Sequence, residues 1–93
     1  AFIGLVNLEE LYLSSNQISH IEQNTFNYLI NLKVLNLRQN KLQILCKDLF
    51  KNCIKLEEIQ LNFNQIHTVE QNAFDGLDNL KYLNLSCNQV KLV

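Results

Sequence analysis

A motif that recurs every 24 residues constrains this chain more than any other feature of its sequence. The motif Leu-x-x-Leu-x-Leu-x-x-Asn-x-Leu, in which Ile or Val replaces some of the leucines, occurs four times without a gap. Its copies begin at Leu8, Leu32, Leu56 and Leu80. A repeat of this length is typical of a solenoid, where each unit buries its apolar side chains against its neighbours. We therefore expect a curved stack of coils instead of a closed globule.

Three further apolar positions recur in the same register, and we expect all of them to lie in the core. The first always holds an aromatic ring, and the other two hold aliphatic side chains or Cys. In order, these columns are Phe2, Phe26, Phe50 and Phe74; Ile21, Leu45, Val69 and Val93; and Leu5, Leu29, Cys53 and Leu77. A stack of bulky rings should hold the coils further apart than a sheet does. This mismatch predicts a curved stack with the sheet on its inner side.

Each unit contains a short alternation of apolar and polar residues, which predicts a short strand. The strands are expected near Tyr12, Asn36, Gln60 and Asn84, stacked as one parallel sheet. Parallel strands need a connection of about a dozen residues or more, and the rest of each unit supplies it. An Asn column should satisfy backbone groups where the chain leaves the sheet, because an amide side chain offers donors and an acceptor. Its members are Asn16, Asn40, Asn64 and Asn88.

These motifs resemble the leucine-rich repeat family over the whole length of the chain. The 24-residue unit with its Phe position is similar to the subfamily found in Toll-like receptor ectodomains, secreted insect immune proteins and matrix repeat proteins. The resemblance implies an α/β solenoid: a right-handed horseshoe segment with short parallel strands on the concave face. It implies irregular or short helical turns on the convex face. It also implies that ligands, mostly proteins, are held on the concave face.

The chain begins and stops in the middle of a unit, and neither end carries a polar or Cys-rich cap. We interpret residues 1–93 as a single segment of about four units, without caps, from the central part of a longer array. Uncapped ends would expose apolar columns, so the ends and the repeat flanks are candidate surfaces for self-association.

Bulk charge selects no partner, because 8 Lys and Arg residues balance 9 Asp and Glu residues. A protein that binds nucleic acid by neutralising phosphates needs a basic surplus, so we expect no nucleic-acid partner. No apolar run approaches the roughly 18–20 residues of a membrane span, so none is expected in this segment. No catalytic arrangement, metal cluster or Gly-rich phosphate loop can be recognised. We therefore expect no enzyme activity, no cofactor and no metal.

The residues between the leucines should point to the concave surface, because neighbouring strand residues face opposite sides. Tyr and Arg on such a surface are typical of binding hot spots. The concave face is therefore the candidate site for a protein ligand or co-receptor. Its candidate binding residues are Tyr12, Ser14, Asn36, Arg38, Gln60, Asn62, Phe63, Tyr82 and Asn84.

Two columns beside this face raise separate questions. Phe63 stands where the other units have Ser15, Gln39 and Cys87, and it either packs over the Asn64 turn or serves as an exposed anchor. Opposite charges alternate along the column Glu9, Lys33, Glu57, Lys81. We interpret that alternation as weak pairing between neighbouring strands at every step.

The cysteines and histidines indicate no shared site. Cys53 replaces a core Leu and should be buried, whereas Cys46 follows the inward Leu45 and should point away from the core. Three Cys residues leave at least one unpaired, and a bond between Cys46 and Cys53 would be strained. The two His residues occupy different positions of the repeat, so they do not stack.

The functional interpretation is a binding module from an extracellular or cell-surface receptor of innate-immune type. Asn84-Leu85-Ser86 is a glycosylation sequon, and a glycan on Asn84 would cover part of the concave face. Two alternatives remain. One is a structural, assembly or matrix segment without a discrete ligand site, and the other is a cytoplasmic scaffold with free thiols.

Overall fold

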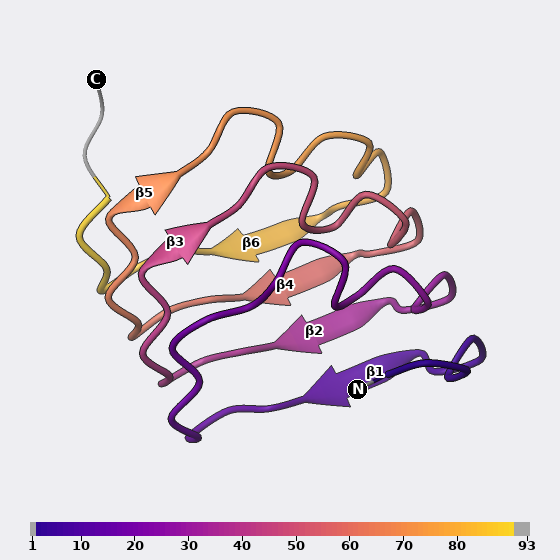
Figure 1. Cartoon of the computed structure of the whole chain (residues 1–93), viewed down its shortest axis with the longest axis horizontal. Coiled ribbons are helices and arrows are strands. Elements are labelled where there is room, and N and C mark those ends of the chain that lie inside the picture. The colour runs from indigo at the N-terminus through magenta and orange to yellow at the C-terminus, as the bar shows by residue number, and fades with distance from the viewer. Residues whose placement is uncertain (1, 91–93) are drawn as a thin grey trace.

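Successive coils of the chain build one parallel sheet in the computed structural model, which describes residues 2–90. Its strands are β1 (Glu10–Tyr12), β2 (Val34–Asn36), β4 (Glu58–Gln60) and β6 (Tyr82–Asn84). They lie side by side in the order β1-β2-β4-β6, and every pair is parallel (Figure 1). The sequence expectation of a solenoid of short parallel strands is confirmed.

The register of this sheet places equivalent residues of the repeat directly opposite one another. Leu11, Leu35, Ile59 and Leu83 are paired in one row across the four strands. The two central members of the row, Leu35 and Ile59, are fully buried. A shift by one residue would turn the leucines outward, so the apolar pattern itself fixes the register.

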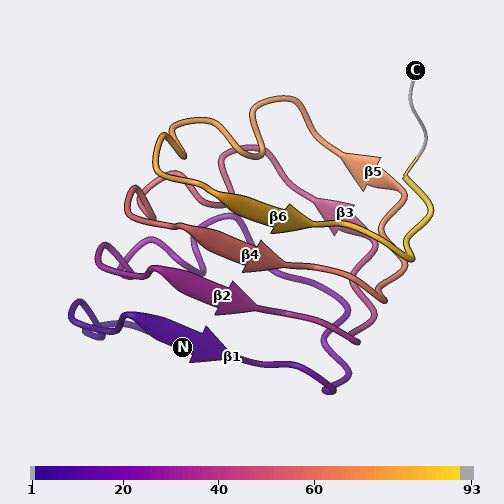
Figure 2. The same ribbon diagram turned by 180° about the vertical axis from the view of Figure 1, so that it is seen from behind.

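A second, smaller sheet lies on another wall of the coils and was not expected. It pairs β3 (Ile44–Leu45) with β5 (Thr68–Val69) in parallel. Figure 2, seen from behind, shows both strands apart from the main sheet. The remaining connections within residues 2–90 are turns and extended segments without a helix. Of the two forms expected for the convex side, the irregular one is therefore present.

The Phe residues stack through the core. Ring centroids of Phe2 and Phe26, Phe26 and Phe50, and Phe50 and Phe74 lie 6.1, 6.0 and 5.7 Å apart. Neighbouring strands of a sheet are only about 4.8 Å apart. The coils are therefore wider on the Phe side, and the main sheet forms the inner, concave face.

The Asn side chains tie each unit to the one before it. The Asn64 Nδ2 group donates to the carbonyls of Leu61 in its own unit and Leu37 in the preceding unit, each at 3.0 Å. The Asn64 Oδ1 atom accepts from the backbone N–H of Leu42 at 3.1 Å. Asn40 and Asn88 repeat this arrangement, whereas the exposed Asn16 donates only to carbonyls of its own unit.

The other apolar columns are buried most completely in the central coils. Leu29, Leu45 and Cys53 are fully buried, and Ile21 is buried. Leu5 is 46% exposed, whereas Leu77 and Val69 are half-buried. The remaining column member, Val93, lies outside the described residues.

Two sequence expectations need correction. Cys46 does not turn away from the core, because its side chain is half-buried and packs against it. The charge column forms ion pairs at two of its three steps. Lys33 Nζ lies 3.6 Å from Glu9 Oε1, and Lys81 Nζ lies 3.6 Å from Glu57 Oε1. Within the described part of the chain Lys33 and Glu57 form no ion pair, since the Lys33 amine is directed to Glu9.

A second column of amide donors was missed in the sequence. Asn31 Nδ2 donates to the carbonyl of Val6 at 2.7 Å, and Asn79 Nδ2 donates to the carbonyl of Ile54 at 3.1 Å. Lys55 occupies the position between them, and its Nζ donates to Asn31 Oδ1 at 2.8 Å. No helix in residues 2–90 is long and apolar enough to cross a membrane.

Candidate functional site

The concave surface is formed by outward residues from equivalent positions of all four main strands. Pairing between neighbouring units continues past the strand ends, because Gln39 N donates to Asn62 O at 3.0 Å and Phe63 N donates to Ser86 O at 3.1 Å. The backbone beneath the surface is therefore held from the start of each strand to the corner that follows it. Side chains on this face occupy fixed rows, which is what a preorganised binding surface requires.

An acidic and aromatic cluster occupies the beginning of the strands. Glu10, Val34, Glu58 and Tyr82 are paired in one row, so Val34 separates the two carboxylates. Tyr12 is 59% exposed, and its hydroxyl donates to Glu10 Oε1 at 3.2 Å. That hydrogen bond, with a smaller electrostatic effect of Glu10 and Glu58, raises the pKa of Tyr12 above its usual range. Both carboxylates therefore act on the same part of the face.

Hydrogen bonds between neighbouring outward residues order the rest of this cluster. Gln60 Nε2 donates to Glu58 Oε2 at 2.8 Å. Asn84 Nδ2 donates to the Tyr82 hydroxyl at 3.3 Å, and its Oδ1 accepts from Ser86 Oγ at 2.6 Å. The half-buried sequon residue Asn84 thus has both ends of its amide engaged within the face.

A different arrangement occupies the end of the strands. The guanidinium of Arg38 lies over the Phe63 ring, with Cζ 5.2 Å from the centroid. Phe63 remains 46% exposed, so it is a surface residue that packs on the preceding unit. The two expectations for Phe63 are therefore each met only in part: the ring is exposed, but it packs against Arg38.

Asn62 departs from the expectation that it faces the ligand. Its side chain is only 6% exposed, although it occupies the same repeat position as the exposed Arg38 of the preceding unit. The Asn62 Oδ1 atom has no hydrogen-bond donor, and it is the one buried side-chain N or O atom of the described residues in that condition. Such an acceptor is costly, by about 1–3 kcal/mol, unless a donor reaches it.

The corners after the strands share an unusual backbone conformation. Ser15, Gln39, Phe63 and Cys87 have φ angles of 57°, 57°, 59° and 58°, although none of them is Gly or Asn. A positive φ turns the chain away from the sheet and places these side chains at the rim of the concave face. This is why the Phe63 ring can reach the Arg38 guanidinium.

The remaining candidate binding residues, Asn36 and Ser14, are polar and lie between the two ends of the strands. Asn36 is half-buried, and its Oδ1 accepts from the backbone N–H of Arg38 at 3.0 Å. Ser14 is half-buried as well. Sequence reasoning passed over Glu10 and Glu58 as binding residues. Their recurrence 48 residues apart, beside the row that contains Tyr12, was the signal that could have identified them.

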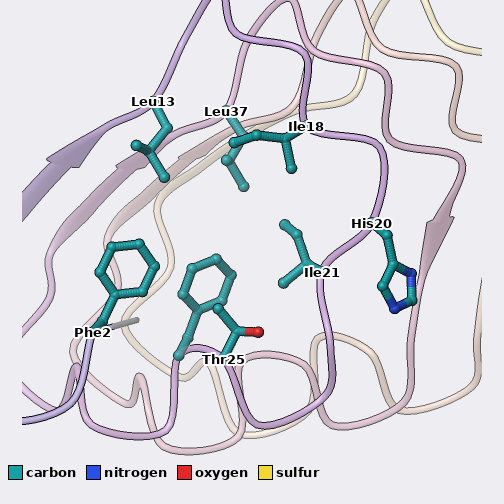
Figure 3. A pocket seen from close by; sticks show the side chains of 8 residues that line it. Phe2, Leu13, Ile18, His20, Ile21, Thr25 and Leu37 are labelled. Atoms are coloured by element: carbon teal, nitrogen blue, oxygen red, sulfur yellow. The ribbon is translucent and has the colours of Figure 1, made fainter.

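Outside this face an apolar pocket of about 150 Å³ lies between the first and second coils. Its lining residues are Phe2, Leu13, Ile18, His20, Ile21, Thr25, Phe26 and Leu37. Leu13, Ile18 and Ile21 project toward its middle, whereas the His20 ring stands at the edge (Figure 3). The three Cys residues carry free thiols. Among residues 2–90 no three His, Cys, Asp or Glu side chains gather in a group that could hold a metal ion.

Comparison with known proteins gives a consistent result. The chain is similar to TLR13 in a crystal structure of a TLR13–ssRNA13 complex, with 35% sequence identity and a TM-score of 0.95. The similarity covers 99% of this chain but only 13% of that TLR13 chain. The comparison with curated protein sequences gives no match. A sequence model of the leucine rich repeat family matches residues 6–65 and again residues 30–90. The chain therefore belongs to the leucine-rich repeat family.

Proposed function

We propose that this chain is a recognition module that holds a protein ligand or co-receptor on its concave sheet, within an extracellular or cell-surface receptor of innate-immune type. The observation that carries the proposal is the cluster of two exposed Tyr and two Glu side chains on a continuous hydrogen-bonded backbone. Large amphipathic side chains on a rigid support lose little conformational freedom on binding. The module acts by binding and carries out no reaction of its own.

The similarity to TLR13 supports a receptor setting. Because the chain spans 13% of the length of that TLR13 chain, we also propose that it is the central part of a longer array. TLR13 is bound to ssRNA13 in that structure, so nucleic acid is the alternative ligand class. A net charge of −1 and the two concave carboxylates favour a protein instead, since phosphates require a basic surface.

Alanine substitution on the concave face tests the proposal. Tyr12→Ala and Tyr82→Ala should each weaken binding of the partner by more than about 1 kcal/mol while the thermal unfolding midpoint stays unchanged. Gln17→Ala, at an exposed position outside the sheet, is the control and should have no effect. Unchanged affinity in both concave variants would remove the proposed site.

A structural segment is the second candidate, and one observation favours it. Val6, Ile30 and Ile54 occupy the same repeat position on one flank and are 38%, 44% and 54% exposed. An apolar stripe of this kind is suited to association between chains. Light scattering would support this candidate if it showed an oligomer that dissociates in Ile30→Ser and Ile54→Ser variants but not in concave variants.

Glycosylation of Asn84 remains a prediction that depends on the extracellular setting. A glycan attached to Asn84 Nδ2 would disturb the hydrogen bond to Tyr82 and cover the part of the face around β6, the edge strand of the described sheet. The intact mass of the protein secreted from its own source checks this point. A fully occupied Asn84 would move the proposed ligand to a flank of the solenoid.

A further inference from the structure

We propose that the concave face recognises its protein partner through arginine side chains, so that the partner presents a basic segment. This inference rests on the proposed function and names the chemistry of the ligand. It starts from the surplus of acceptors over cations on the face. Among the outward residues of the strands and corners, Glu10 and Glu58 carry negative charge and only Arg38 carries positive charge.

The two carboxylates lack cationic partners. The ion pairs of the described residues use the neighbouring Glu9 and Glu57 instead, which pair with Lys33 and Lys81 at the edge of the sheet. Glu10 and Glu58 lie two strands apart in one row, about 10 Å across the sheet. Val34 lies midway between them, about 5 Å across the sheet from each, so a cation above Val34 would be placed between the two carboxylates.

Two exposed aromatic residues belong to the same cluster, Tyr12 on the strand next to Val34 and Tyr82 on the strand beyond Glu58. Tyr12 and Tyr82 are 59% and 49% exposed, and neither ring is covered by a cation among the described residues. The molecule already shows how its aromatic side chains receive a guanidinium, because Arg38 lies over Phe63 at 5.2 Å. A guanidinium stacks on aromatic rings and is less strongly hydrated than an ammonium. Arginine therefore fits the cluster better than lysine.

The buried acceptor on Asn62 gives an independent indication of a missing donor. Asn62 follows Glu58 and Gln60 at successive outward positions of the same segment, and its Oδ1 has no partner at 6% exposure. Arg38, at the equivalent position of the preceding unit, is exposed and lies over the ring of Phe63, the residue next to Asn62. When Arg38 moves aside, a guanidinium of the partner can donate to Oδ1 and take the place of Arg38 on Phe63. Five N–H donors in one plane make this double contact feasible.

The experiment uses a tetra-arginine peptide with capped ends as the probe, at low salt of about 20 mM to limit screening. Backbone amide shifts are followed by NMR while the peptide is added to the full 93-residue chain. We expect saturable shifts at Tyr12, Val34, Glu58 and Tyr82. A tetra-citrulline peptide has the same shape without the charge and should cause none.

Two matched pairs of substitutions separate the site from bulk charge. Glu10→Gln with Glu58→Gln should weaken peptide binding about tenfold, the effect of removing two partly exposed ion pairs. Glu9→Gln with Glu57→Gln removes the same charge from adjacent residues and should leave the affinity within about twofold. Equal losses in the two pairs would reduce the contact to non-specific charge attraction and overturn the proposal.

Asn62 provides a second readout. Asn62→Leu removes the unpartnered acceptor, so it should raise or preserve the thermal unfolding midpoint while lowering the affinity for the tetra-arginine peptide. Unchanged peptide affinity in this variant would remove Asn62 from the site. A single-stranded RNA oligonucleotide that shifts the same amides more strongly than the peptide would overturn the choice of a basic protein segment. Failure of the peptide, with partner binding still lost in Tyr12→Ala and Tyr82→Ala, would reject arginine recognition and leave the proposed function intact.

Discussion

At the scale of single residues, the thiol of Cys53 is the group whose environment differs most from water. It replaces a core Leu, is fully buried, and its Sγ donates to the carbonyl of Phe26 at 3.4 Å. Burial raises the pKa of Cys53 from 9.0 to about 11. Cys87, by contrast, is exposed at a corner. The same side chain is thus chemically protected in one coil and accessible in another.

This shift predicts a pH-dependent stability difference. The unfolded Cys53 loses its proton near pH 9.0, whereas the folded thiol keeps it until about pH 11. The unfolded state therefore binds fewer protons in that window, and the free energy of unfolding should fall as pH rises through it, by about 3 kcal/mol in total. Urea titrations at several pH values check this against Cys53→Ala, in which that part of the slope should vanish. A slope unchanged in the variant would contradict the account.

The Asn column predicts a large contrast between two identical substitutions. Asn64→Ala leaves the Leu42 N–H without a partner in the interior. It also removes one of the two amide donors at the Leu37 and Leu61 carbonyls, which keep Asn40 and Asn88, so it should cost about 2–4 kcal/mol. Asn16→Ala removes bonds to exposed carbonyls and should stay within about 0.5 kcal/mol. Chemical denaturation of both variants provides the measurement. Similar losses would mean that these side chains do not act by joining units.

Burial of Cys53 could be predicted from the sequence, because its column is apolar in every unit. Burial of Asn62 could not. Arg38 and Phe63, which come from two different units, meet beside Asn62 at the end of the strands, and the repeat does not predict that contact. Alternation along a strand predicts the face on which the Asn62 side chain starts, but not how far neighbouring units bury it. The candidate site was therefore predicted as a surface, while its two distinct ends were not.

At the scale of elements, each main strand is followed by a corner in which one residue has a positive φ. The residue types found at these corners do not favour that conformation. Gln39 illustrates the point, since its φ is 57° while its N–H still donates to Asn62 O at 3.0 Å. Hydrogen bonding between coils imposes this conformation. It could not be read from Ser15, Gln39, Phe63 or Cys87, because those residue types have no common preference for it. The apolar periodicity predicted the four main strands. The pairing of β3 with β5 in neighbouring coils could not be predicted from the repeat.

Substitutions at Gln39 should separate backbone strain from side-chain loss. Gln39→Gly relieves about 1–2 kcal/mol of strain and adds about 0.5–1 kcal/mol of chain entropy, so we expect a net gain of about 0.5 kcal/mol. Gln39→Val should lose about 1–2 kcal/mol, because a β-branched side chain tolerates positive φ least. Denaturation midpoints report the two signs. Destabilisation by Gly would show that the Gln39 side chain matters more than its φ angle.

At the scale of the whole molecule, stability is a sum of contacts between neighbouring coils. The inward leucines of the central coils are fully buried, as at Leu37 and Leu61. Toward the ends of the described stack the exposed fractions rise, to 46% at Leu5 and 37% at Leu83. The overall architecture was predictable because one apolar pattern, repeated four times, admits one way of stacking.

Native-state hydrogen exchange should reveal this gradient at equivalent positions. The Leu37 N–H and the Leu13 N–H both donate to the next strand at 2.8 Å, to Gln60 O and Asn36 O respectively. Leu37 lies between complete coils and should exchange about tenfold or more slowly than Leu13. Amide exchange followed by NMR compares the two within one sample. Equal protection would indicate that the stack opens only as a single unit.

The asparagine bonds also give the stack a direction. Asn40 accepts from the Ile18 N–H and donates to the Leu13 carbonyl of the coil before it. Asn88 forms the same bonds with Ile66 and Leu61. Removing a coil from the C-terminal side therefore uncovers backbone groups of its predecessor, whereas removing one from the N-terminal side uncovers an amide side chain like that of Asn16. The two faces of a coil are thus chemically different, and a segment that covers one of them would not fit the other.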